Sequence, residues 1–80
     1  MPYIKQSDRI DLEEGRHPQT AGELNYIITN LLIDYTYEKG LNYETINSII
    51  GVLESAKLEY YRRLASSYED TKIQQNGDVY

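Results

Sequence analysis

The chain contains 80 residues with 13 acidic and 8 basic side chains, a net charge of −5, 9 tyrosines, and no phenylalanine, tryptophan or cysteine. A chain of this length forms one domain at most, with a marginal hydrophobic core, and without cysteine it has no disulfides to reinforce that core. The negative charge argues against nonspecific binding to duplex nucleic acid or anionic membranes, and a single histidine without cysteine excludes a conventional zinc site within one chain.

Residues 1–19 are polar and predict an N-terminal arm or a short helix. Ser7 is suited to cap a short helical segment that runs through Glu14 and ends at Gly15, and His17–Gln19 is typical of a connector. The first residues lack the apolar stretch of a secretory signal, so we expect no signal peptide. No apolar run approaches the roughly 20 residues that a membrane span needs.

Residues 20–40 predict a first long helix, from Ala21 to Lys39. Thr20 and Glu23 have the spacing of a capping box, in which each side chain accepts a hydrogen bond from a free backbone N–H at the helix start. Gly40 is placed to end the helix in a left-handed conformation. One apolar stripe runs along the helix: Leu24, Ile27, Ile28, Leu31, Leu32 and Tyr35.

Residues 42–66 predict a second long helix, capped by Asn42, and residues 67–80 a C-terminal tail. The alternative is that residues 66–73 extend this helix. Its apolar stripe is Ile46, Ile49, Ile50, Leu53, Ala56, Tyr60 and Leu64. Gly51 lies within the helix and costs about 1 kcal/mol relative to alanine, which is tolerable where another helix crosses closely. Because the connection between the two helices is short, we expect a long antiparallel helical hairpin in a single all-α domain.

Both predicted helices carry apolar residues outside their main stripe. These residues are Tyr26, Ile33 and Tyr37 in the first helix, and Val52 and Leu58 in the second. A helix that is apolar on two sides is usually buried on two sides, so we expect a homo-oligomeric helical bundle, most simply a dimer of hairpins. The alternative is that these are scattered exposed residues, which are common in proteins.

The second helix also carries the densest group of chemically distinctive side chains: Lys57, Tyr60, Tyr61, Arg62 and Arg63. Arginine binds phosphate or carboxylate through two parallel hydrogen bonds, and tyrosine rings stack on bases, so the group suits an anionic, nucleotide-like ligand in a pocket between subunits. The alternative is ordinary helix chemistry, in which Lys57 extends along the surface or meets Glu54, and Glu59 pairs with both arginines.

Asn25 and Thr29 lie beside the stripe of the first helix and add a polar candidate site, although they equally suit local hydrogen bonding. Signals for catalysis are few. Glu54 and Glu59 lie about 140° apart around a helix, and neighbouring carboxylates such as Asp70 with Glu69 usually form a solvated surface. We therefore expect no enzyme, no cofactor and no bound metal.

Several segments resemble motifs of an uncharacterised family of small bacterial and tailed-phage proteins. They read GELNYIIT at 22–29, IIGVLESAKLEYYRR at 49–63, YEDTK at 68–72 and NGDVY at 76–80. The resemblance spans most of residues 22–80, and the part before Gly22 departs from what the family would lead us to expect. It implies no activity, but it implies that the terminal residues through Tyr80 belong to the fold and can reach a neighbouring subunit.

These observations lead to three functional hypotheses for a protein of the bacterial or infected-cell cytoplasm. The first is an oligomeric, non-catalytic binding protein, encoded by a phage, that sequesters a small anionic ligand such as a nucleotide-derived immune signal. The second is a protein–protein adaptor or inhibitor acting through its tyrosine-rich helical surface. The third and weakest is a small metal-dependent hydrolase using Glu54, Glu59 and Asp70.

Overall fold

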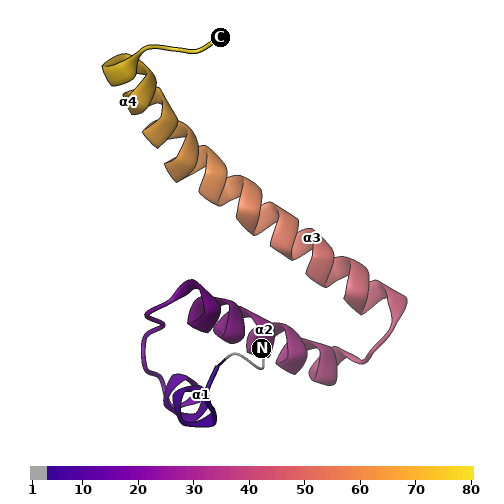
Figure 1. Cartoon of the computed structure of the whole chain (residues 1–80). Coiled ribbons are helices and arrows are strands. Elements are labelled where there is room, and N and C mark those ends of the chain that lie inside the picture. The colour runs from indigo at the N-terminus through magenta and orange to yellow at the C-terminus, as the bar shows by residue number, and fades with distance from the viewer. Residues whose placement is uncertain (1–3) are drawn as a thin grey trace. The chain divides into compact units, whose positions relative to one another are not determined.

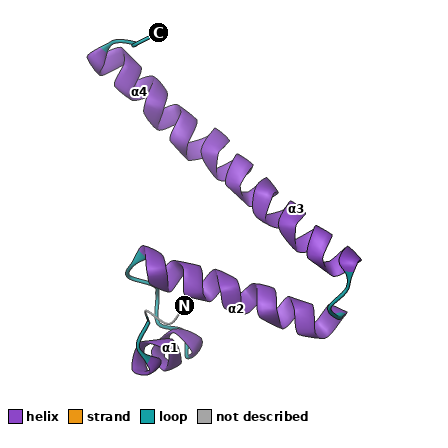
Figure 2. Ribbon diagram, turned by 45° about the vertical axis from the view of Figure 1, so that its right-hand side comes forward, coloured by secondary structure: helices purple, strands orange, loops and turns teal. Residues whose placement is uncertain are grey.

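The computed structural model describes residues 4–80, and these contain helices and no strand, which confirms the all-α class (Figures 1 and 2). The chain divides into two compact units, residues 1–45 and residues 46–80. The first contains α1 (Gln6–Glu13) and α2 (Ala21–Lys39), and the second contains most of one long helix. Among the residues that the structure describes, no helix combines the length and apolar character needed to cross a lipid bilayer.

The short helix α1 begins one residue after Lys5, which makes no side-chain cap, so the predicted cap at Ser7 is wrong. Ser7 lies inside the first turn, next to Asp8, whose carboxylate favours the positive end of a helix. The helix ends as predicted before Gly15, whose φ of 107° is accessible to glycine but strained for other residues. The sequence therefore predicted the end of α1 correctly but not its start.

The boundaries of α2 agree with the sequence. The hydroxyl of Thr20 accepts a hydrogen bond from the N–H of Glu23 at 3.1 Å, which confirms half of the capping box. The reciprocal bond is displaced by one residue, because Glu23 accepts from the N–H of Gln19 at 2.8 Å. Gly40 ends the helix with φ 96° and ψ 147°, an extended conformation with positive φ that is almost restricted to glycine, and not the predicted left-handed turn.

The two helices of the first unit pack through Leu12 and Tyr26. These are the two hydrophobic residues counted as buried in the described chain, with 5% and 8% of their surface exposed. The Tyr26 hydroxyl donates a hydrogen bond of 2.7 Å to Oε1 of Glu13, so the ring is buried while its polar tip is satisfied. Tyr26 therefore joins α1 to α2 within one chain. Its position in the sequence predicted a contact between copies, but little of its surface remains exposed for such a contact.

The second long helix begins at Tyr43, where Asn42 Oδ1 accepts a hydrogen bond of 2.9 Å from the N–H of Thr45, as its predicted capping role requires. It comprises α3 (Tyr43–Tyr60), the π-helical segment η1 (Tyr61–Ala65) and α4 (Ser66–Asn76) without a break. The helix continues past the predicted boundary at residue 66, so residues 66–76 extend it, which was the alternative to a tail. No glycine or proline interrupts residues 52–76, and the helix ends only where Gly77 adopts φ 83°.

Gly51 provides a test of the second unit by itself, because a Cβ added there meets no atom within 4 Å. Replacing Gly51 with alanine should stabilise the helix by about 1 kcal/mol, since alanine loses less backbone entropy on folding. Urea unfolding measures this difference. Gly40→Ala is the matched control and should destabilise the protein, because its φ of 96° is strained for alanine. A loss of stability in Gly51→Ala would instead reveal a close neighbour at this position.

Candidate ligand-binding surface

The π-helical segment η1 holds three of the candidate ligand-binding residues: Tyr61, Arg62 and Arg63. Here the N–H of Ser66 bonds to the carbonyl of Tyr61, five residues earlier, where an α-helix would use the residue four earlier. Such a turn accommodates one extra residue, and π-helical turns are frequent at functional sites. The sequence pattern did not predict it, because η1 contains no glycine or proline to mark an irregular turn.

The basic side chains of the candidate site each meet a carboxylate. Lys57 lies 3.2 Å from Glu54, and Arg62 lies 3.7 Å from Glu59, which also pairs with Arg63. These are the pairs that the spacing of the residues predicted. The three basic side chains keep 69–72% of their surface exposed, so the ion pairs contribute little stability and an incoming anion can compete for the cations.

A shallow groove of about 420 Å³ lies on the second unit beside η1. Its lining is almost entirely apolar, with a charge at the edge, and consists of Ala56, Glu59, Tyr60, Arg63 and Leu64. The hydroxyl of Tyr61 lies 3.3 Å from Oε2 of Glu69, which orients the ring along the helix surface. The structure therefore brings Tyr60 and Arg63 together at one groove, whose lining also includes Glu59, the ion-pair partner of Arg63.

Asn25 and Thr29 form a separate group on α2, in the first unit. Asn25 is exposed and Thr29 is half-buried. Neither side chain forms a hydrogen bond with another described residue, so both amide and hydroxyl remain available to a ligand or a neighbouring chain.

The predicted interface residues other than Tyr26 are open to solvent in the described units. Tyr37 exposes 84% of its surface, and Ile33, Val52 and Leu58 expose 44%, 62% and 57%. Two of these residues lie on α2 and two on α3.

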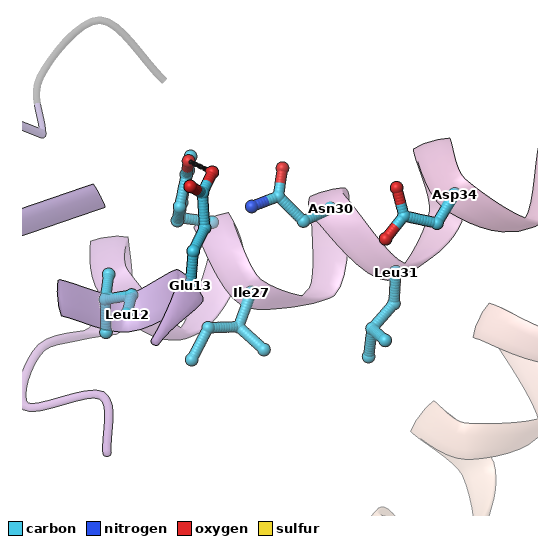
Figure 3. A pocket seen from close by; sticks show the side chains of 7 residues that line it. Leu12, Glu13, Ile27, Asn30, Leu31 and Asp34 are labelled. Atoms are coloured by element: carbon cyan, nitrogen blue, oxygen red, sulfur yellow. Dashed lines mark hydrogen bonds between the residues drawn. The ribbon is translucent and has the colours of Figure 1, made fainter. Parts of the chain in front are cut away.

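A pocket of about 410 Å³ between α1 and α2 was not predicted (Figure 3). In the view of Figure 3, the polar groups of Glu13, Asn30 and Asp34 lie along its upper side, and the apolar side chains of Leu12, Ile27 and Leu31 point downward. Two carboxylates oppose an anionic ligand, so this pocket does not suit the ligand class that the basic residues of the second unit suit. The signal available in the sequence was the pair Asn30 and Asp34, four residues apart on one helix face.

An ion-pair network in the first unit was also missed. The guanidinium of Arg16 donates to both carboxylate oxygens of Glu23, at 3.2 and 3.0 Å, and lies 3.7 Å from Asp8. The Glu23 side chain is only 13% exposed. These bonds tie the connector to the start of α2. The arginine lies seven residues from its partner in an irregular segment, so no helical spacing could indicate the pair.

The same network lowers the pKa of Glu23 below its usual value, first because Arg16 donates to the carboxylate and then because the N–H of Gln19 does. A lowered pKa in the folded state stabilises the fold above the unfolded pKa of about 4.3, and this contribution is lost as the pH falls through the lower folded value. The stability difference between the natural protein and Glu23→Gln should therefore shrink as the pH falls from about 6 to about 3, measured by urea unfolding.

Arg16→Gln is the control for this pH dependence, because it removes the main cause of the lowered pKa while leaving Glu23 in place. The stability of Arg16→Gln should depend less on acid pH than that of the natural protein, but more than that of Glu23→Gln, because the N–H of Gln19 still donates to Glu23. A stability difference that is independent of pH in both variants would contradict the assignment.

The carboxylates proposed for a hydrolase do not come together around a metal. Glu54 and Glu59 are engaged with basic side chains of their own helix. Within residues 4–80, no three aspartate, glutamate, histidine or cysteine side chains are grouped to hold a metal ion.

Comparison with known proteins finds a family but no characterised relative. No curated protein and no solved structure matches the chain. A family model described as "domain of unknown function (DUF6899)" matches residues 1–79, nearly the whole sequence. This match confirms the resemblance to an uncharacterised family and includes the N-terminal segment before Gly22. The chain is therefore a member of the DUF6899 family.

Proposed function

We propose that the protein is a non-catalytic binding protein that works as an assembly of several copies. The observation that carries this proposal is the shortage of buried apolar surface. Only Leu12 and Tyr26 are buried hydrophobic residues in the described chain, whereas large side chains such as Leu31, Ile50 and Leu64 expose 56–64% of their surface. Small domains usually compensate for so small a core by association, and a second unit made of one helix cannot enclose a core alone.

The assembly that we propose starts from a helical hairpin. The short connection Gly40–Asn42 favours an antiparallel pairing of the stripe on α2 with the stripe on α3. Such a hairpin would leave Ile33, Tyr37, Val52 and Leu58 on its outer surfaces, where contacts with other copies would cover them.

The ligand that this surface fits best is small, anionic and partly aromatic. Arg62, Arg63 and Lys57 supply exposed positive charge, and Tyr60 or Tyr61 supplies a ring for stacking beside the groove. Asn25 and Thr29 would add polar contacts if the assembly brings α2 to this surface. A nucleotide-derived immune signal, held without turnover in the cytoplasm of a bacterium or an infected cell, has this chemistry.

A thermal-shift panel of cyclic and linear nucleotides tests the proposal. A ligand present at a hundred times its Kd should stabilise the protein by about 2.7 kcal/mol, and the ligand should be recovered unchanged. Arg62→Gln with Arg63→Gln should abolish the shift. Lys39→Gln is the matched control, because this lysine lies over the ring of Tyr35 at 6.0 Å, in the first unit and outside the candidate group. The absence of a shift with every nucleotide would contradict the ligand class.

The second candidate is a protein adaptor or inhibitor. It is favoured by the pairing of every basic residue of the candidate site with a carboxylate, which leaves tyrosine and leucine as the unpartnered surface. Large exposed apolar and aromatic surfaces are typical of protein interfaces. This alternative predicts no nucleotide shift and a stoichiometric protein complex that the substitution Tyr37→Ser weakens at least tenfold.

A further inference from the structure

The π-helical turn keeps the apolar stripe of the second unit continuous. From Ile46 to Tyr60 the stripe alternates steps of three and four residues, through Ile49, Leu53 and Ala56. The next step of three would fall on Arg63, but the apolar residues are Leu64 and then Tyr68. One extra residue in η1 absorbs this shift, so that Leu64 and Tyr68 remain in line with the stripe.

The contact between Tyr61 and Glu69 supports this change of register. In a continuous α-helix, residues eight apart lie about 80° apart around the axis. With one residue accommodated in the π turn they behave as residues seven apart and lie nearly in line, and the Tyr61 hydroxyl is indeed 3.3 Å from Glu69 Oε2. The apolar stripe therefore extends from α3 across η1 into α4.

In the proposed hairpin, α2 would not reach the end of this stripe. The 19 residues of α2 span about 28 Å, whereas the 18, 5 and 11 residues of α3, η1 and α4 together span about 51 Å. A hairpin turning at Gly40–Asn42 would therefore bring α2 only to about the level of Tyr61. Leu64 and Tyr68 expose 56% and 64% of their surface, and nothing within the second unit covers them.

The charges around this uncovered stretch are complementary to those of a second copy. Arg62 and Arg63 precede Ser66, and Glu69 and Asp70 follow it at nearly equal distances along the chain. Two copies placed antiparallel with Ser66 at the same level bring the arginines of each to the same height along the axis as the acidic residues of the other. The same arrangement places Leu64 of one copy against Tyr68 of the other. A parallel arrangement would bring like charges together.

We propose that residues 60–72 of two copies pair antiparallel around a two-fold axis at the level of Ser66. The proposal rests on the proposed assembly and names its contact segment and direction. It makes the groove lined by Tyr60 and Arg63 part of the contact between copies, so that a ligand held there would lie between them. A two-fold contact is self-complementary: if one residue of the first copy meets a second residue of the other copy, then the second residue of the first copy meets the first residue of the other. Here Leu64 and Tyr68 form the apolar centre, Tyr60 of each copy meets Lys72 of the other, and the charges flank this centre.

Disulfide cross-linking of the full chain tests this arrangement, because the natural sequence has no cysteine. Tyr60→Cys and Lys72→Cys are prepared separately, then oxidised singly and as a mixture. The antiparallel contact predicts a mixed disulfide between the two variants that forms at least tenfold faster than either homodisulfide, identified by its mass. Within one helix the two positions lie about 18 Å apart along the axis, so the homodisulfides cannot form in this arrangement.

Ser66→Cys is the control for the face of the helix, since Ser66 lies two residues from both Leu64 and Tyr68 and therefore on the opposite side. It should not cross-link. Homodisulfides of Tyr60→Cys or Lys72→Cys, or cross-linking of Ser66→Cys, would overturn the antiparallel contact. An assembly seen by light scattering without the mixed disulfide would overturn this contact and leave the proposed assembly standing, whereas a monomer at all concentrations would overturn both.

Discussion

Replacing Tyr26 with alanine is expected to release α1 from α2 and to unfold α1. Removing a buried aromatic ring costs about 3–5 kcal/mol, and Tyr26 and Leu12 are the buried hydrophobic residues that join these helices. The 8 residues of α1 are too few to form a stable helix alone. Hydrogen exchange of residues 6–13, followed by mass spectrometry, should become at least about 100-fold faster, while α2 keeps its protection.

Tyr26→Phe measures the contribution of the hydroxyl to stability separately from that of the ring. This variant keeps the apolar contact and loses the 2.7 Å hydrogen bond to Glu13, so the expected cost is about 1 kcal/mol. Exchange in α1 should then rise only about fivefold. Protection of α1 that is unchanged in Tyr26→Ala would show that other contacts hold the helix, and Leu12→Ala provides an independent test of the same packing.

Replacing Leu64 with aspartate is expected to disrupt the proposed assembly. In a two-fold contact each substitution acts twice, because both copies lose a leucine whose burial is worth roughly 1.5–3 kcal/mol. Each copy would also bury an unpaired carboxylate. We expect the dimer Kd to rise at least about 100-fold, measured by light scattering or sedimentation across a range of protein concentrations.

Ser66→Asp is the matched control for Leu64→Asp. It adds the same charge two residues away, on the opposite side of the helix. The dimer Kd of Ser66→Asp should match that of the natural protein within about threefold. Equal effects of the two substitutions would indicate a general response to added negative charge, and an unaffected Leu64→Asp would exclude Leu64 from the contact.

Local signals in the sequence determined the class of the fold and most helix ends. Thr20, Gly40 and Asn42 act within three or four residues of their own positions, so their roles at the ends of α2 and α3 follow from short-range hydrogen bonding and backbone freedom. The pairs between Glu54 and Lys57, and between Glu59 and the two arginines, follow from the same helical spacing.

The three-dimensional structure decided what covers Tyr26. Periodicity placed Tyr26 on a second apolar stripe, but only the packing of α1 shows that its partner belongs to the same chain. The bond between Arg16 and Glu23 and the π turn at Tyr61–Ala65 likewise depend on competition between backbone and side-chain contacts that no residue spacing encodes. Sequence periodicity specifies which side of a helix is apolar, and through-space contacts determine what that side meets.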